Sequence, residues 1–230
     1  MAVCSGLAAI VAAICAFVKA GDHVLVADSV YGPTRNFCNK RLASYGVTTE
    51  YYDPLIGAGI KNLIKSNTKA IYCEAPGSLS FEMQDIPAIA REAHARDIPV
   101  LADTTWGTPY FFKSFEHGVD VSIHAATKYI VGHSDVMMGM IVTNERYWLP
   151  VRRTVADYGY CSSADECYLA LRGLRTIGVR MKQQMASAIK VAQWLQTRAE
   201  VSRVLFPALE SDPGHAIWKR DFERSEEHTS

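Results

Sequence analysis

Short apolar segments alternate with helix-like segments along most of the chain, and this alternation constrains the fold more than any other feature of the sequence. The segments that we interpret as strands are residues 23–28, 47–52, 70–74, 98–102, 119–124 and 139–143. Helical patterns separate several of them; in residues 86–96, for example, Ile86, Ile89 and Ala93 share one face. Alternating strands and helices are typical of a mainly parallel sheet with helices on both faces, so we predict an α/β fold.

The segments outside this alternation are predicted to be mainly helical. Ser5 is a good N-cap for a helix that continues to about Lys19. Residues 2–18 are almost wholly apolar, but they contain no basic residue and are fewer than the ~20 residues of a membrane-spanning helix. We therefore expect a buried helix and no membrane association. Further helices are predicted from about 34 to 44, at 60–65, from 145 onward, at 164–175 and at 179–198, and residues 201–205 are expected to begin a strand of a small α+β domain.

The charge balance argues against a nucleic-acid partner. The 230 residues include 24 Lys and Arg against 24 Asp and Glu, so the net charge is zero and no basic surface is indicated. The six cysteines form no CxxC pair, and most lie in apolar segments, where cysteine behaves as a small apolar residue. This cysteine usage predicts a reducing, cytoplasmic location.

Residues 122–135, SIHAATKYIVGHSD, contain the lysine that most clearly suggests chemistry. A predicted strand leads into small and hydroxylated residues and then Lys128, which Tyr129, Ile130 and Val131 follow. An ammonium group among apolar neighbours is costly to bury, and a lowered pKa or a covalent bond removes that cost. Both occur in catalytic Schiff-base lysines, whereas a surface lysine that extends out of a half-buried segment explains the pattern equally well. This stretch alone leaves the two interpretations open.

Three residues are candidates for binding a phosphate. Gly6 and Leu7 begin the first predicted helix, where free amides and the helix dipole attract anions, although an ordinary capped helix is more common. Thr127, directly before Lys128, offers a hydroxyl to a phosphate or simply ends the strand.

Two further residues are candidates for holding a flat, nitrogen-containing ring. Ligands of open α/β sheets bind at the carboxyl ends of the strands. Tyr31 follows the strand at 23–28, where its ring can stack on a ligand or pack within its own turn. Asp103 follows the strand at 98–102, where it can pair with a protonated ring nitrogen or form a turn.

An amide pair at a helix start, an aromatic face, an acid and a lysine together describe a site for pyridoxal 5′-phosphate. In such a site the acid keeps the pyridine nitrogen protonated, the lysine forms the imine, and the ring acts as an electron sink. The chain has no GxGxxG, P-loop or HExxH motif that would indicate another cofactor. His124, His133 and Asp135 are close in sequence, but no further ligand joins them at zinc spacing, so we interpret them as structural and expect no metal site.

Seven stretches carry a resemblance to a known family. They are CSGLAAI (4–10), GDHVLVADSVYGPT (21–34), EAPGS (74–78), ADTTWGTPY (102–110), ATKYIVGHSD (126–135), LRGLRTIGVR (171–180) and HAIWKRDF (215–222). With these stretches the sequence resembles the Cys/Met-metabolism family of pyridoxal-phosphate enzymes over nearly its whole length. The resemblance implies a fold-type I aminotransferase-like large domain, with a seven-stranded type of sheet, over residues 1–200. Residues 201–223 would begin a C-terminal domain.

The resemblance also implies residue roles and a quaternary structure. Lys128 would be the Schiff-base lysine, Asp103 the pyridinium partner and Tyr31 the stacking residue that also assists proton transfer, with Gly6, Leu7 and Thr127 around the phosphate. Members of the family are tetramers whose active sites are shared between subunits. The resemblance therefore implies a homo-oligomer that acts on a small amino acid.

Two positions distinguish this chain within the family. The γ-lyases and γ-synthases usually have an asparagine at the place of Ser78 and a serine at the place of Ala125. Gly77-Ser78 resembles the bacterial β-lyases, so the resemblance implies a carbon–sulfur β-lyase that cleaves L-cystathionine to homocysteine, pyruvate and ammonia, a step towards methionine. Ala125 removes one hydroxyl that would bind phosphate. Elimination or replacement at the γ-carbon is the alternative chemistry.

Two segments that the family carries have no counterpart in the sequence. One is an N-terminal segment whose tyrosine and arginine reach the phosphate of a neighbouring subunit, and the other is a C-terminal domain with an arginine that binds the substrate carboxylate. The resemblance ends at Phe222, and residues 224–230, RSEEHTS, are interpreted as a non-native tail. A third hypothesis follows, that the chain is a truncated fragment that binds the cofactor weakly or not at all and is inactive alone.

Overall fold

A seven-stranded sheet forms the centre of the computed structural model, which describes residues 1–222. The tail interpreted as non-native, residues 224–230, lies outside the described residues. The strands are β1 (Ala2–Val3), β2 (His23–Ala27), β3 (Thr48–Tyr52), β4 (Thr68–Glu74), β5 (Val100–Asp103), β6 (Val121–His124) and β7 (Gly139–Thr143). The α-helices are α1 (Gly6–Cys15), α2 (Gly32–Asn36), α3 (Ile86–His94), α4 (Thr108–Phe111), α5 (Glu145–Asp157), α6 (Ala164–Leu174), α7 (Ile177–Gln196) and α8 (His215–Asp221).

The strand order is β1-β7-β6-β5-β4-β2-β3, and the five strands from β6 to β3 are mutually parallel. At the other edge, β7 runs antiparallel to β6, and β1 runs antiparallel to β7. The predicted mainly parallel sheet is therefore confirmed. Because parallel strands end at the same edge, the residues that follow β2, β4, β5 and β6 are brought together.

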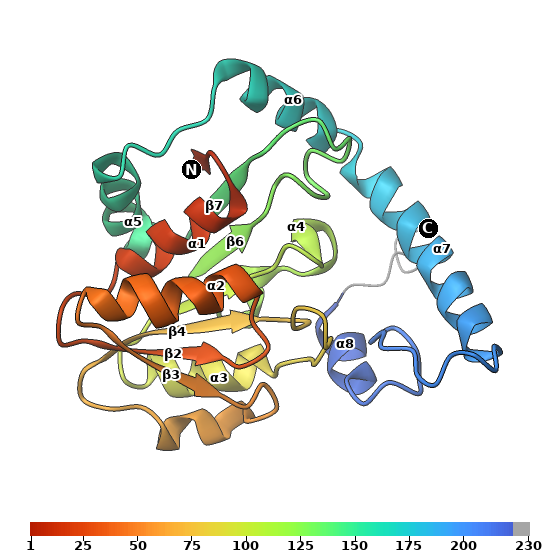
Figure 1. Ribbon diagram of the computed structural model, residues 1–230, viewed down its shortest axis with the longest axis horizontal. Helices are drawn as coiled ribbons and strands as arrows, with labels where there is room; N and C mark the ends of the chain where they lie inside the picture. Colours follow the sequence, from red (N-terminus) through yellow and green to blue (C-terminus); the bar gives the residue numbers. More distant parts are fainter. Residues whose placement is uncertain (223–230) are drawn as a thin grey trace.

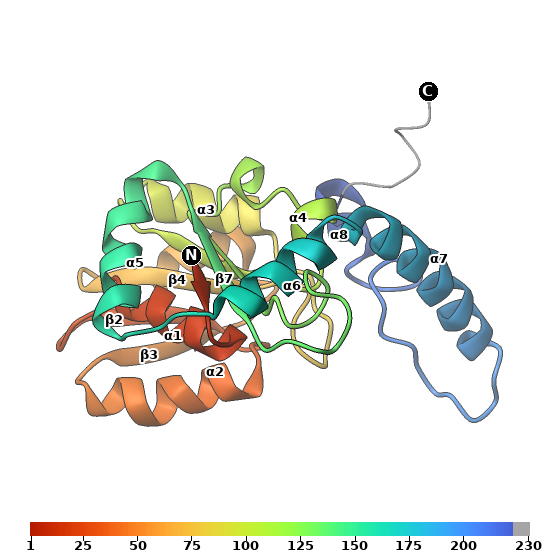
Figure 2. The same ribbon diagram turned by 90° about the horizontal axis from the view of Figure 1, so that it is seen from above.

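Helices cover both faces of the sheet, as predicted. Figure 2 shows α3 on one side of the strands and α1 with α2 on the other. In Figure 1, α6 lies over the end of β7 and α7 extends away from the sheet towards α8. All five residues of β2 are buried, and so are six of the ten residues of α1. The apolar N-terminal run is thus a core helix, and no helix of residues 1–222 is long and apolar enough to cross a membrane.

Some local predictions differ in detail from the structure. The short helix predicted at 60–65 is a 3₁₀-helix that begins earlier, η2 (Gly57–Asn62). The helix predicted to continue to residue 44 is confirmed, and its centre is a π-helix, η1 (Phe37–Leu42). Residues 201–205 form no strand, because β-branched residues alone do not supply the hydrogen-bonded neighbour that a strand needs.

Four short elements were not expected from the sequence. β1 has two residues, which is too few for any periodicity, and it is fixed by pairing of Ala2 with Met140. The other three are α4, α8 and a second 3₁₀-helix, η3 (Ser114–His117), which are also short.

Candidate active site

Lys128 lies in the loop that follows β6, at the carboxyl edge of the sheet. This loop is a series of tight turns, in which the Lys128 N–H donates to the Ala125 carbonyl (3.0 Å) and the Gly132 N–H donates to the Lys128 carbonyl (2.8 Å). The following residues, Ile130 and Val131, are buried in a small apolar cluster, but the side chain of Lys128 is exposed. Of the two interpretations that the sequence leaves open, the structure agrees with an exposed lysine that extends from a half-buried segment.

Tyr31 brings an aromatic ring to the Lys128 ammonium group. It lies in the loop after β2, and the Lys128 Nζ is 5.9 Å from the centroid of its ring. The tyrosine is 43% exposed, so its ring is accessible to a flat ligand. The structure thus brings together two residues that are far apart in the sequence.

Asp103 ends β5 and is buried at the same sheet edge. Its Oδ1 accepts the Thr105 N–H (2.9 Å), and the Thr105 hydroxyl accepts the Ala125 N–H (2.8 Å), which connects the acid to the Lys128 loop. Burial raises the pKa of Asp103, while the hydrogen bonds from Thr105 and the positive charge of Lys128 oppose this rise. A buried carboxyl group of this kind is a suitable partner for a cation that a ligand brings with it.

Glu74 is a residue of this site that the sequence analysis did not single out. It ends β4, where it is the register partner of Asp103 on β5. Burial, followed by the negative charge of Asp103, raises the pKa of Glu74 to about 7. The sequence contains a signal for this residue, because Glu74 is a charged residue at the end of an apolar predicted strand and begins the stretch EAPGS.

Gly6 and Leu7 begin α1, as predicted, and this end of the helix lies against the Lys128 loop. The Ser5 hydroxyl accepts the Ala8 N–H (3.1 Å), so α1 has an ordinary N-cap. A β-carbon on Gly6 would lie 2.8 Å from the β-carbon of Ala125, so only a residue without a side chain fits here. The amides of the first helical turn are therefore close to the loop that carries Lys128.

Thr127 has a structural use that the sequence did not reveal. Its hydroxyl accepts the Met138 N–H (2.8 Å) and donates to the Met138 carbonyl (3.1 Å). These bonds close the loop between β6 and β7, and they direct the hydroxyl proton at the protein backbone. A phosphate would have to compete with the Met138 carbonyl for this proton.

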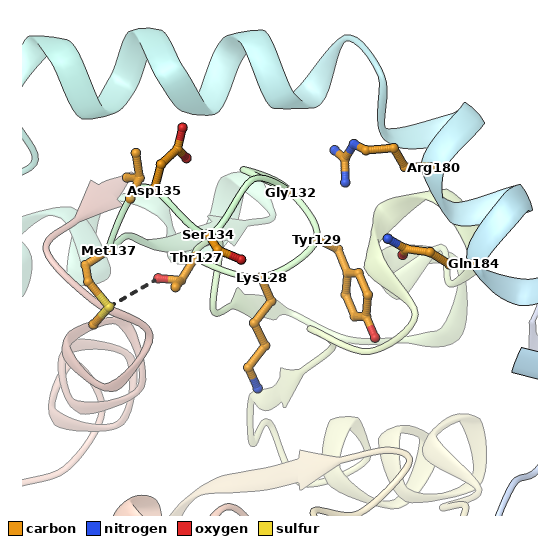
Figure 3. A pocket seen from close by; sticks show the side chains of 10 residues that line it. Thr127, Lys128, Tyr129, Gly132, Ser134, Asp135, Met137, Arg180 and Gln184 are labelled. Atoms are coloured by element: carbon orange, nitrogen blue, oxygen red, sulfur yellow. Dashed lines mark hydrogen bonds between the residues drawn. The ribbon is translucent and has the colours of Figure 1, made fainter.

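A cavity of about 710 Å³ adjoins Lys128, and this volume is common for a small-molecule site. Figure 3 shows that the Lys128 side chain extends away from α6 and α7, whereas Arg180 and Gln184 project from α7 towards the Lys128 loop. The residues that line the cavity are Thr127, Lys128, Tyr129, Gly132, Ser134, Asp135, Val136, Met137, Arg180 and Gln184.

Comparison with known proteins identifies the family. The profile of the family described as "Cys/Met metabolism PLP-dependent enzyme" matches residues 1–228. The chain belongs to this family. It is 52% identical over 218 residues to a putative cystathionine beta-lyase of Rhizobium johnstonii, covering 95% of this chain and 55% of that protein. It is 46% identical over 219 residues to the cystathionine beta-lyase MetC of Escherichia coli, covering 94% of this chain and 55% of the relative.

A solved structure confirms the fold-type I architecture. The cystathionine gamma-lyase of Lactobacillus plantarum, crystallised in complex with L-serine, superposes with a TM-score of 0.94 and 32% sequence identity. The match covers 97% of this chain and 58% of that one. The chain thus spans little more than half the length of the relatives that it matches.

The residues at the sheet edge fit the pyridoxal phosphate of this Cys/Met-metabolism family. A primary amine, an accessible aromatic face, a buried acid and the first turn of a helix are the four groups that this cofactor needs. Lys128, Tyr31, Asp103 and the Gly6 end of α1 supply one of each at the same edge. The fit rests on the chemistry of this set of groups and on the close approach of Gly6 to the Lys128 loop.

Proposed function

We propose that the chain is the cofactor-binding part of a carbon–sulfur β-lyase that cleaves L-cystathionine to homocysteine, pyruvate and ammonia, a step towards methionine. The observation that carries the proposal is the meeting of Lys128, Tyr31 and Asp103 at one sheet edge. The names of the relatives support cystathionine as substrate. Because the chain covers 55% of the Rhizobium johnstonii relative, the activity is proposed for the whole protein.

The residues of the site would hold the cofactor as follows. Lys128 would bind its aldehyde carbon, and Asp103 would pair with its ring nitrogen. Tyr31 would cover one face of the ring. The amides of Gly6 and Leu7 would bind the phosphate at the start of α1. Thr127 would add its hydroxyl only by giving up its bond to the Met138 carbonyl.

Lys128 would also move the proton on which the reaction depends. When bound, pyridoxal phosphate supplies an electron sink for the charge that remains on the α-carbon of an amino acid after deprotonation. The Nζ of Lys128, once the substrate amino group has taken its place on the aldehyde carbon, would be a free amine and would remove that proton as a general base. The nearby Tyr31 hydroxyl would assist proton transfer. The negative charge of Asp103 would keep the ring nitrogen protonated, which is the state in which the sink is strongest.

We further propose the organisation of the whole protein. Residues 1–200 would form the large domain, and residues 201–223 the beginning of a C-terminal domain, although residue 223 lies outside the described part. The protein would be a cytoplasmic homo-oligomer, a tetramer by resemblance to the family, in which a neighbouring subunit completes the site. Its partner molecule would be a small amino acid.

The direct test is to trap the cofactor on the chain. Pyridoxal phosphate is added to the purified protein, the adduct is reduced with borohydride, and the modified peptide is identified by mass spectrometry. We expect modification at Lys128, and none at this position in Lys128→Ala. The exposed Lys61, on η2, provides the matched control, because Lys61→Ala should leave trapping unchanged. Trapping spread over many surface lysines, with no preference for Lys128, would contradict the proposed role.

Product analysis separates the β-lyase from γ-chemistry. With L-cystathionine, β-elimination gives pyruvate, and γ-elimination gives 2-oxobutyrate. The pair Gly77-Ser78 favours β-elimination, because an asparagine is usual at the second position in the γ-enzymes. Specific trapping at Lys128 with neither product would support the third hypothesis, an inactive fragment that still binds cofactor.

A further inference from the structure

Glu74 connects three separate segments at the sheet edge. Its Oε2 accepts the Tyr31 N–H (2.9 Å), which comes from the loop after β2. Its Oε1 accepts the hydroxyl of Ser78 (2.5 Å), in the loop after β4. On its other side, Glu74 is paired in register with Asp103 of β5. One buried carboxyl group therefore contacts or adjoins the segments that carry the aromatic residue, the acid and the Gly77-Ser78 pair.

The loop after β4 is held tightly in the same place. The Ser78 N–H donates to the Ser29 carbonyl (2.8 Å), and the Gln84 side chain donates to the Glu74 carbonyl (2.6 Å). Neither hydrogen bond involves the carboxylate of Glu74. The Tyr31 N–H, in contrast, donates to that carboxylate, while the Tyr31 carbonyl accepts the Arg35 N–H (3.1 Å) at the start of α2. The Tyr31 amide is thus more dependent on the Glu74 carboxylate than the backbone amide of Ser78 is.

Resting on the proposed function, we propose that Glu74 is a positioning residue, which fixes the backbone of Tyr31 relative to Asp103 so that the tyrosine ring lies at the correct height above the cofactor. Glu74 would not touch the reacting atoms. It would act through the hydrogen bond that its side-chain oxygen accepts from the Tyr31 N–H.

The charges around Glu74 indicate that an uncharged side chain at this position could also hold the Tyr31 amide. The groups that face it are Asp103 on β5, Lys128 after β6 and the phenol of Tyr72 on β4. Because burial and the Asp103 charge raise the pKa of Glu74 to about 7, a large share of the side chains is already protonated near neutral pH. The protonated form still has an oxygen that accepts the Tyr31 amide. The proposal therefore predicts that glutamine replaces glutamate well and that alanine does not.

Hydrogen exchange in the cofactor-free protein tests the positioning directly. We expect the Tyr31 amide to exchange about tenfold faster in Glu74→Ala than in the unchanged protein, because a partly buried amide loses its acceptor. In Glu74→Gln the amide should stay protected to within about threefold. Exchange in β2, next to Tyr31 in sequence, is the internal reference. Equal acceleration of β2 and Tyr31 would mean general destabilisation and would overturn the proposal, as would an unchanged Tyr31 rate in Glu74→Ala.

Cofactor affinity provides the second measurement. The dissociation constant of pyridoxal phosphate should rise about tenfold in Glu74→Ala and less than about threefold in Glu74→Gln. Glu50→Gln is the matched control, because Glu50 on β3 pairs with His23 and Lys65 instead of with the Tyr31 amide. A Glu74→Gln variant that binds as weakly as Glu74→Ala would show that the charge is required, and the proposal would be wrong.

The two proposals fail in different ways. If trapping at Lys128 fails in the unchanged protein, the proposed function is wrong, but the exchange of the Tyr31 amide still decides the role of Glu74. If trapping succeeds and the two Glu74 variants bind cofactor as the unchanged protein does, only the positioning role is wrong.

Discussion

The guanidinium group of Arg180, on α7, occupies the space that a side chain on Gly132 would fill. Its Nη2 donates to the carbonyls of Gly173 (2.8 Å) and Ile130 (3.3 Å), and its Nε donates to the Thr176 hydroxyl (3.0 Å). One arginine thus fastens the loop after Lys128 to the junction of α6 and α7. Desolvation lowers the pKa of Arg180, so this contact partly removes the guanidinium group from water, and its Nη1 has no hydrogen-bond partner among the described residues.

Gly132→Ala should destabilise the protein strongly for two reasons. Gly132 has a φ of +78°, where any other residue is strained, and its new methyl group would displace the Arg180 guanidinium. We expect the free energy of unfolding, from urea titration, to fall by about 3 kcal/mol. Gly21→Ala is the matched control, because Gly21 has a φ of +90° but nothing within 4 Å of the added carbon. It should cost only the backbone term of about 1 kcal/mol, and an equal loss in both variants would argue against the Arg180 contact.

Gly77 and Ser29 should be energetically coupled. A β-carbon on Gly77 would lie 2.5 Å from the Ser29 Cβ, so Gly77→Ala forces the two loops apart and should cost about 2 kcal/mol of unfolding free energy. Ser29→Gly provides the missing space, and the double variant should recover at least about 1 kcal/mol relative to the sum of the single changes. A double-mutant cycle by urea unfolding measures this term, and strict additivity would contradict the contact.

Asp120 should matter far more for stability than an exposed acid does. It is buried, and its carboxylate accepts the Val100 N–H (2.8 Å), the Asn144 side-chain amide (2.7 Å) and the His94 Nε2 (2.8 Å). Asp120→Ala leaves the Val100 amide without its acceptor, and we expect a loss of about 3 kcal/mol in urea unfolding. For comparison, Glu200→Ala removes an exposed partner of Arg198 and should cost less than about 0.5 kcal/mol. Similar losses in the two variants would show that the Asp120 bonds contribute little.

The sequence predicted which residues would reach the sheet edge, because that prediction needs only the ends of the strands. Apolar runs place Asp103 at the end of one strand and Tyr31 in the loop that follows another, and parallel pairing brings strand ends together. The exposure of Lys128 was not predictable in this way, because it depends on the turns that separate it from Ile130 and Val131. Ile130 and Val131 follow Lys128 closely in sequence, but the turns of this loop leave them buried and the lysine exposed.

The roles of the supporting residues could not be predicted from the sequence, because they depend on strand register and on packing between distant elements. Glu74 is a partner of Asp103 only because β4 and β5 pair in one particular register. Arg180 contacts Gly132 although it lies far along the chain from it, and no sequence periodicity predicts such a contact. The same holds for β1, whose two residues become a strand only because β7 offers a free edge.

His124 should make the protein less stable as the pH falls. The residue ends β6, its Nε2 lies 3.0 Å from the Ser122 hydroxyl, and its Nδ1 has no hydrogen-bond partner among the described residues. Burial lowers the pKa of His124 to about 4, whereas a histidine in the unfolded chain has a pKa of about 6.5. Between these values the unfolded chain binds the proton and the folded chain does not, so the free energy of unfolding decreases as the pH falls from about 6.5 to about 4.

The measurement must separate His124 from Glu74, whose raised pKa acts in the opposite direction over a similar range. His124→Gln keeps a polar group near Ser122 but removes the titration. Urea unfolding of both proteins from pH 7 to about 4.5 should show that the unchanged protein loses about 2 kcal/mol relative to the variant. His133→Gln, at an exposed position, controls for the loss of a histidine as such. If the difference between the unchanged protein and His124→Gln stayed constant across this range, His124 would not be buried in its neutral form.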